Sequence, residues 1–148
     1  MTTFAKTTSG MDFQVTFKIN EKIFLRDPES SEVGKQIVKN AIDLIYQLGL
    51  EQFTFKKLAV ETNSTEATIY RYFENKHRLL LYILNWYWCY MEFLVMFKLQ
   101  NVADKKEKLK LIVELLTHEL PESSGKFDYN KKYLNQIVIA ESSKVYLV

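Results

Sequence analysis

The sequence predicts an all-α fold, on three observations about its composition and its pattern of apolar residues. Only four glycines and two prolines occur in 148 residues, which suits helices better than a turn-rich β protein. Apolar residues recur at three- and four-residue spacing over most of the chain from Ile37 onward. Ser, Thr, Asn or Asp stands directly before several of these stretches, where it can cap a helix.

The composition is that of a soluble globular protein, and it limits the possible partners. The chain is 47% hydrophobic and 26% charged, and its length suits one domain, or a small domain fused to part of a second. A net charge of only +2 means that a nucleic-acid site has to be built by placement of charges rather than by bulk charge. The single cysteine, Cys89, and an N-terminus without the apolar core of a signal peptide suit the cytoplasm.

Residues 1–30 are expected to form an extended or strand-like arm. Apolar and polar residues alternate over residues 12–19, which is typical of a strand. Asn20-Glu21 could turn the chain into a second strand, although this pair is a poor hairpin turn; the alternative is an extended arm packed on the rest of the chain. The apolar face of the expected strand consists of Phe13, Val15, Phe17 and Ile19.

A first helix of about three turns is expected to end at Gly49. Ser30 or Ser31 supplies the signal for its start, and a glycine at its end is a natural stop. Its apolar residues at helical spacing are Ile37, Ala41, Leu44, Ile45 and Leu48.

Two much shorter helices are expected next, separated by a tight turn. Thr54 can cap the first and Thr65 the second, and Asn75 can then cap a long helix. Asn63 lies in the turn, where asparagine adopts a positive φ more readily than most non-glycine residues. Together with the first helix, this arrangement predicts a helix-turn-helix whose second short helix enters a DNA major groove.

The long helix after Asn75 raises the question of a membrane span, because residues 79–97 are nearly all apolar. Three polar residues at seven-residue spacing, Arg78, Asn85 and Glu92, form a stripe on it. A glutamate near the middle of a bilayer is costly, and the Trp and Tyr residues lie in the centre rather than at the ends. We therefore expect a core helix and no membrane partner.

The opposite face of this helix is too large for a three-helix unit to cover, so further helices are expected. One should follow Asp104 and another should cover residues 131–148. The face in question consists of Leu79, Ile83, Trp86, Tyr90, Phe93 and Phe97. The apolar stripe of the helix after Asp104 consists of Leu109, Ile112, Val113, Leu116 and Leu120.

No catalytic or metal-binding constellation is present in the sequence. His77 and His118 have no metal-ligand spacing with Cys89, and the four glycines are too scattered for a phosphate-binding loop. We therefore expect neither an enzyme nor a cofactor.

The second short helix has the residue types that DNA recognition needs. Its first turn, residues 65–68, offers hydroxyls and backbone N–H groups to phosphates and short side chains to base edges. Arg71 can bond a guanine or a phosphate, and Tyr70 and Tyr72 end in hydroxyls that suit backbone contact. The alternative is a solvated face on a small helical subdomain. Basic groups nearby are Lys56, Lys57 and Lys76.

The segment FTFKKLAVETNSTEATIYRYFENKHRLL, residues 53–80, resembles the N-terminal domain of the TetR family of bacterial transcriptional regulators. The sequence departs from the family pattern at Asn63, where a glycine is usual, at Ser64, and at Glu66, where a basic residue is common. The positions that match the pattern are Thr54, Leu58, Ala59, Thr65, Thr68, Ile69, Tyr70, Tyr72, Phe73, Lys76, Leu79 and Leu80.

The resemblance implies a DNA-binding domain over residues 31–82 and a helical ligand-binding and dimerisation domain over residues 83–148, shorter than is usual in the family. Glu66 can accept from a cytosine amino group but repels phosphate, so it should narrow the DNA sequences that are tolerated. The DNA contacts that the resemblance and the residue chemistry imply are Thr54, Lys56, Thr65, Glu66, Ala67, Thr68, Tyr70, Arg71, Tyr72 and Lys76.

The function expected on these grounds is a transcriptional repressor that binds a near-palindromic operator as a homodimer and responds to a small hydrophobic or aromatic ligand. The alternatives are a helical module that binds a protein partner, or a small-molecule sensor that keeps the fold without binding DNA. An aromatic stripe is also consistent with plain core. The candidates for lining a ligand pocket are Trp86, Tyr90, Phe93 and Phe97.

Overall fold

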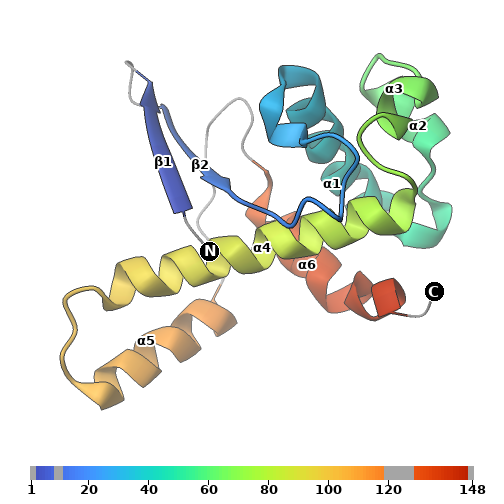
Figure 1. Ribbon diagram of the computed structural model, residues 1–148. Coiled ribbons are helices and arrows are strands. Elements are labelled where there is room, and N and C mark those ends of the chain that lie inside the picture. Colours follow the sequence, from blue (N-terminus) through green and yellow to red (C-terminus); the bar gives the residue numbers. More distant parts are fainter. Residues whose placement is uncertain (1–2, 9–11, 119–128, 147–148) are drawn as a thin grey trace.

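The computed structural model describes residues 3–8, 12–118 and 129–146. Its body is helical, as the sequence predicts, and it carries one β-hairpin near the N-terminus (Figure 1). The elements in chain order are β1 (Thr3–Thr8), β2 (Asp12–Phe17), the 3-10 helix η1 (Pro28–Ser30), α1 (Glu32–Gln52), α2 (Phe55–Glu61), α3 (Glu66–Tyr70), α4 (Lys76–Leu99), α5 (Lys105–Thr117), α6 (Lys131–Glu141) and the 3-10 helix η2 (Ser142–Tyr146).

Side-chain caps start the helices at the predicted positions. Ser31 accepts a hydrogen bond from the N–H of Gly34 at the start of α1, and Asn75 accepts one from the N–H of Arg78 at the start of α4. Asp104 caps α5 in the same way. Each cap satisfies backbone N–H groups that the first turn of a helix otherwise leaves without a partner.

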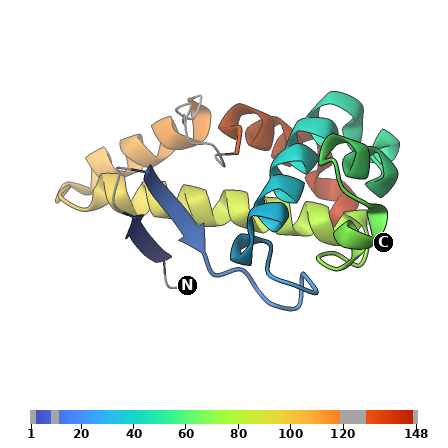
Figure 2. The same ribbon diagram turned by 90° about the horizontal axis from the view of Figure 1, so that it is seen from above.

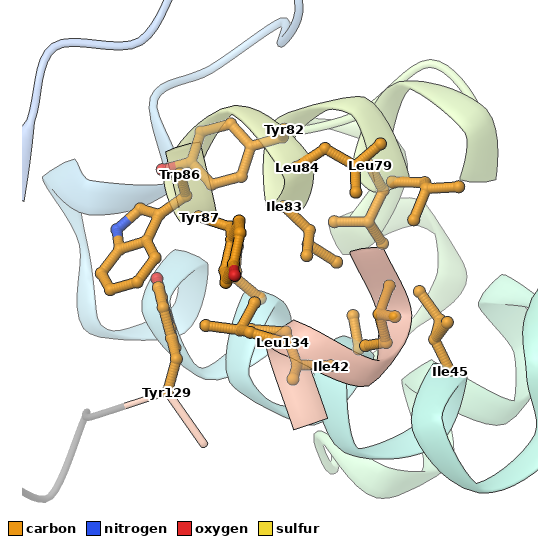
Figure 3. Packing of buried hydrophobic residues seen from close by; sticks show 14 of the residues in the cluster. Ile42, Ile45, Leu79, Tyr82, Ile83, Leu84, Trp86, Tyr87, Tyr129 and Leu134 are labelled. Atoms are coloured by element: carbon orange, nitrogen blue, oxygen red, sulfur yellow. The ribbon is translucent and has the colours of Figure 1, made fainter. Parts of the chain in front are cut away.

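The central element is α4, which extends along most of the molecule. The helices α1, α2, α3 and α6 gather around its N-terminal half, and α5 lies along its C-terminal half (Figures 1 and 2). The core joins α1, α4 and α6, because the buried side chains of Ile42, Ile45, Ile83 and Leu134 meet there (Figure 3). Since α4 is continuous across residues 82 and 83, the predicted domain boundary falls inside one helix.

The N-terminal hairpin confirms the predicted strand but gives it a different partner. Within the expected range, β2 pairs antiparallel with β1, so that Thr3 lies opposite Phe17. The sequence suggests a second strand after Asn20, but residues 22–26 are not a strand. A turn does form there, because the N–H of Ile23 donates to the carbonyl of Asn20 at 3.1 Å.

The arm packs on α4 through the end of the hairpin. Phe17 and Ile19 are buried, as the alternating pattern predicts, and the ring of Phe17 meets the ring of Trp86 edge-on, with 5.3 Å between the centroids. The side chains of Phe13 and Val15 lie outside the described residues.

The prediction that the apolar stripe of α5 faces the core is wrong. Leu109, Val113 and Leu116 are 64%, 50% and 53% exposed, whereas Leu115, outside that stripe, is buried. The helix α5 packs on α4 and lies along its C-terminal half (Figure 2), with Leu115 on its buried side. Leu120, the last residue of the predicted stripe, lies outside the described residues.

By length and composition alone, α4 could cross a membrane, and no other described helix could. Half of its apolar stretch is buried inside the protein. Its buried residues, including Leu79, Leu80 and Ile83, pack with those of α1 and α6. This is how the core helix of a folded domain behaves.

Glu29 in η1 connects the arm to α4 and to Tyr129, which lies two residues before α6. Its Oε1 accepts a hydrogen bond from the hydroxyl of Tyr129 at 2.8 Å and one from the hydroxyl of Tyr82 at 3.5 Å. Burial raises the pKa of Glu29 above its ordinary value of 4.5 and outweighs the hydrogen bond from Tyr129, which lowers the pKa. The fold therefore favours the protonated form of this carboxyl.

Replacing Glu29 is expected to change how stability depends on pH. Because the folded-state pKa is above the unfolded-state value of 4.5, the stability contribution of Glu29 is fully present below pH 4.5 and is lost as pH rises through the folded-state pKa. Glu29→Gln keeps an acceptor for the two tyrosines but does not titrate. The wild-type free energy of unfolding should therefore fall more steeply than that of the variant above pH 4.5, as measured by urea unfolding from pH 4 to 7. Parallel profiles would contradict this expectation.

Candidate nucleic-acid interface

The candidate interface is formed by α2, the tight turn and α3, at the end of the molecule far from α5 (Figure 1). Thr54 Oγ1 accepts from the N–H of Lys57 at 3.2 Å to cap α2, and Thr65 Oγ1 accepts from the N–H of Thr68 at 3.2 Å to cap α3. Asn63 adopts a φ of 48° in the turn, a left-handed conformation that asparagine tolerates. The caps and the turn confirm the local predictions.

One side of α3 is anchored in the core and the other side is exposed. Ile69 is fully buried, and the ring of Tyr70 lies against the edge of the Phe55 ring, with centroids 4.9 Å apart. The Thr65 and Thr68 hydroxyls lie 3.0 Å apart at the first turn of α3. The residues that face outward along and next to α3 are Thr65, Glu66, Ala67, Tyr70 and Arg71.

Exposed side chains of both signs determine the charge of this surface. Lys56 lies in the first turn of α2 and Arg71 caps the end of α3, and both are exposed. Lys57 is folded back, because its Nζ donates to the carbonyl of Gln52 at 2.7 Å. Glu61 at the end of α2 and Glu66 in the first turn of α3 are exposed carboxylates, so the surface is only slightly basic.

Tyr72 corrects the sequence-based prediction, because it belongs to the core. It is only 3% exposed, and its hydroxyl lies 2.8 Å from the hydroxyl of Ser31. The Arg26 guanidinium lies over the ring, 5.3 Å from its centroid, and the Tyr72 carbonyl accepts from the N–H of Leu25 at 2.7 Å. These contacts attach the N-terminal arm to the residues that follow α3. The sequence around Tyr72 does not predict them.

Lys76 also corrects the prediction, because its ammonium group is used inside the protein. Its Nζ donates to three carbonyls, those of Leu50 at 2.9 Å, Glu51 at 3.3 Å and Phe53 at 3.3 Å. An ammonium group has three N–H donors, and these carbonyls engage all of them. Lys76 therefore holds the end of α1 and is not placed to clamp a phosphate.

The four aromatic residues predicted to line a pocket have different surroundings in the structure. Trp86 is buried, with its ring stacked on that of Tyr90 at a centroid distance of 5.5 Å. The ammonium of Lys131 covers both rings, 5.3 and 5.1 Å from their centroids. Phe93 is half-buried beside Phe17, and Phe97, the fourth candidate, is 68% exposed.

A cavity of about 180 Å³ lies instead between α1 and α6. Sequence reasoning missed it, because its two walls are about 90 residues apart and neither wall carries a recognisable motif. Among the described residues, no group of three or more His, Cys, Asp or Glu side chains could hold a metal ion. The cavity is lined by Ile45, Tyr46, Gly49, Gln136, Ile137, Ala140 and Glu141.

Comparison with known proteins locates a family domain in this chain. The family model described as bacterial regulatory proteins, tetR family, matches residues 37–83, from α1 through α2 and α3 into α4. Residues 37–83 are thus similar to the N-terminal domain of the TetR family. A comparison with curated proteins gives no match.

Two solved structures share the fold of the TetR-family domain and of part of the chain beyond it. AibR in complex with isovaleryl coenzyme A and operator DNA superimposes with a TM-score of 0.60 at 23% identity, over 76% of this chain and 57% of the AibR chain. Apo AibR gives a TM-score of 0.58 at 21% identity, over 76% of this chain and 60% of the other. The present chain thus spans less than two thirds of the AibR chain, and at these identities the likeness shows the fold alone.

Proposed function

We propose that this protein is a DNA-binding transcription regulator that inserts α3 into the major groove. The observation that carries the proposal is the geometry of α3, which is anchored by Ile69 and exposes Glu66, Ala67 and Arg71 after a tight turn. The TetR-family domain and the operator complex described for AibR support it. Phosphate contacts are assigned to Thr54, Lys56, Thr65, Thr68 and the hydroxyl of Tyr70.

The proposed regulator acts in the cytoplasm as a homodimer on a near-palindromic operator. A dimer places two α3 helices in successive major grooves, about 34 Å apart. Large exposed apolar side chains at the far end of the molecule support self-association, because exposed apolar surface can mark interaction sites. They lie on α4 and α5 and are Met96, Phe97, Leu109, Val113 and Leu116.

The proposed mode of regulation is repression relieved by a small hydrophobic or aromatic ligand. The division of the chain into an arm (1–30), a DNA-binding domain (31–82) and a ligand and dimerisation domain (83–148) belongs to this proposal. Two conformations of the dimer would differ in the distance between their α3 helices. A ligand that binds one conformation more tightly shifts the population toward that conformation. The neighbour AibR is described with isovaleryl coenzyme A, which supports ligand control.

Selection of bound sites from random duplex DNA tests DNA binding and half-site spacing together. The regulator should enrich two inverted half-sites at a spacing of one helical turn, and its affinity should fall linearly with the logarithm of salt concentration. Recovery of no enriched site, together with no salt-dependent binding, would reject the proposal.

Truncation of Arg71 and truncation of Lys56 are expected to change DNA binding in different ways. Arg71→Ala should weaken binding to the selected operator by about 1.4 kcal/mol, or tenfold, and relax the preference at one base position. Lys56→Ala should weaken binding to all duplexes alike and reduce the salt slope by about one. Fluorescence anisotropy on the selected operator and on one-base variants measures both effects. Equal losses on every duplex for Arg71→Ala would place that residue on phosphate.

Glu66 is expected to set the sequence preference of this protein. Glu66→Lys replaces a carboxylate that repels phosphate by a cation, so overall affinity for DNA should rise about tenfold. The difference in affinity between matched and mismatched sites should become smaller. Glu66→Gln, which removes the charge alone, is the matched control and should give an intermediate result. Unchanged selectivity in both variants would show that Glu66 is exposed without touching a base.

The second candidate function is a helical module that binds a protein partner. The exposed Met96 and Phe97 at the end of α4 favour it. The two functions separate cleanly, because Phe97→Ala should leave the salt slope of DNA binding intact but abolish capture of a protein partner. A small-molecule sensor would show ligand binding with no DNA affinity at any salt concentration.

A further inference from the structure

The last turn of α1 and the residues before α2 form a corner, residues 49–53, that sets the direction of the DNA-reading helices. Gly49 has φ 75° and ψ 158°, which breaks the helical path of α1. The N–H of Phe53 then donates to the Gly49 carbonyl at 3.1 Å, and Thr54 caps α2 directly afterwards. A small rotation at this corner therefore moves α2 and α3 together.

Side chains from the end of α6 and from η2 reach this corner across about 90 residues of sequence. The Oε1 of Glu141 accepts from the N–H of Leu50 at 3.4 Å, and the Glu141 residue is only 7% exposed. Lys144 Nζ lies 2.7 Å from Glu141 Oε2 and 3.7 Å from Glu51 Oε1. Lys144 thus joins a carboxylate on α6 to a carboxylate on the corner.

The polar link between α6 and the corner lies beside a cavity. The cavity of about 180 Å³ lies beside it, with Gly49 and Ile45 on one wall and Ile137 and Ala140 on the other. The hydrogen bond and the ion pairs are direct connections between α6, η2 and the corner beside this space.

We propose that Glu141 and Lys144 are positioning residues for DNA recognition, which hold the corner at residues 49–53 so that a displacement of α6 reorients α3. The inference rests on the proposed function. It adds a route by which α6 controls the orientation of α3 through α1, without contact with DNA.

Two variants separate the parts of this link. Lys144→Met removes the cation from a side chain that is one third exposed, so the fold should tolerate it. Glu141→Gln keeps an acceptor for the N–H of Leu50 but removes the ion pair, and Lys144→Arg keeps the charge and should behave as wild type. The matched control is Lys110→Met, which breaks the exposed pair between Lys110 and Glu114 on α5, 3.9 Å long.

The first measurement is the backbone amide spectrum of the full chain without DNA. Lys144→Met and Glu141→Gln should shift the amide signals of the corner and also those of Ala67 and Arg71 in and next to α3, whereas Lys144→Arg and Lys110→Met should not. Signals of α3 that stay in place in both Lys144→Met and Glu141→Gln would overturn the proposal.

The second measurement is affinity for the operator selected by the wild type. Lys144→Met and Glu141→Gln should bind three- to tenfold more weakly, with recovery in Lys144→Arg. Shifted α3 signals with unchanged affinity would overturn the positioning role. If the wild type binds no DNA and the α3 signals still shift, the coupling between α6 and α3 stands and the proposed function fails.

Discussion

Replacing Lys76 by methionine is expected to lower the free energy of unfolding by about 3 kcal/mol, because hydrogen bonds from a charged group contribute more than neutral ones and their loss leaves acceptors without partners. The ammonium group donates to the carbonyls of Leu50, Glu51 and Phe53. Methionine has an unbranched apolar side chain similar to the stem of lysine but has no donor. Urea unfolding followed by circular dichroism measures the change.

Lys56→Met is the matched control for Lys76→Met, because it removes the same charge from an exposed position in the first turn of α2. It should leave the free energy of unfolding within about 0.5 kcal/mol of wild type and weaken DNA binding instead. If Lys76→Met were as stable as wild type but bound DNA more weakly, Lys76 would be a phosphate contact, as the sequence predicts.

Replacing Gly49 by alanine is expected to cost about 2 kcal/mol of stability, because its φ of 75° and ψ of 158° lie in a region that is almost restricted to glycine. The added Cβ would meet Glu141 Oε1 at 3.5 Å, which is ordinary van der Waals contact. The cost therefore comes from the backbone and not from a clash. Thermal and urea unfolding of the variant measure it.

Gln47→Ala serves as the control for Gly49→Ala, because Gln47 is exposed on regular α1 helix two residues earlier. It should change stability by no more than about 0.5 kcal/mol, since alanine and glutamine have similar helix propensities. A Gly49→Ala protein as stable as the Gln47→Ala protein would mean that the corner relaxes to a negative φ at no cost.

The parts of the fold that could be predicted from sequence are those decided by short-range chemistry. A threonine or asparagine before a helical stretch finds its N–H partner three residues later, so Thr54, Thr65 and Asn75 were identifiable as caps. In the same way, Gly49 marked the end of regular α1 helix, and Asn63 marked the turn. Anchoring of α3 by Ile69 followed from apolar spacing alone.

The parts that could not be predicted depend on which distant group each side chain finds. Tyr72 and Lys76 stand at positions where the TetR resemblance implies DNA contacts, yet their partners lie 41 residues away at Ser31 and 26 residues away at Leu50. Spacing in the sequence carries no information about such contacts. The stripe on α5 failed for a related reason, because periodicity shows that a helix has an apolar side without showing which neighbour covers it.

The contribution of α6 to the core has a consequence for how the chain folds during synthesis. Leu134 and Ile137 of α6 pack on α1, and the bond between Glu29 and Tyr129 joins residues 100 positions apart. A nascent chain that has emerged only as far as α5 leaves Ile42 and Ile45 without that cover. The core around α1 can therefore be completed only after α6 has left the ribosome. Contacts of such long range slow folding, and a product that ends before α6 exposes core surface that chaperones and proteases recognise.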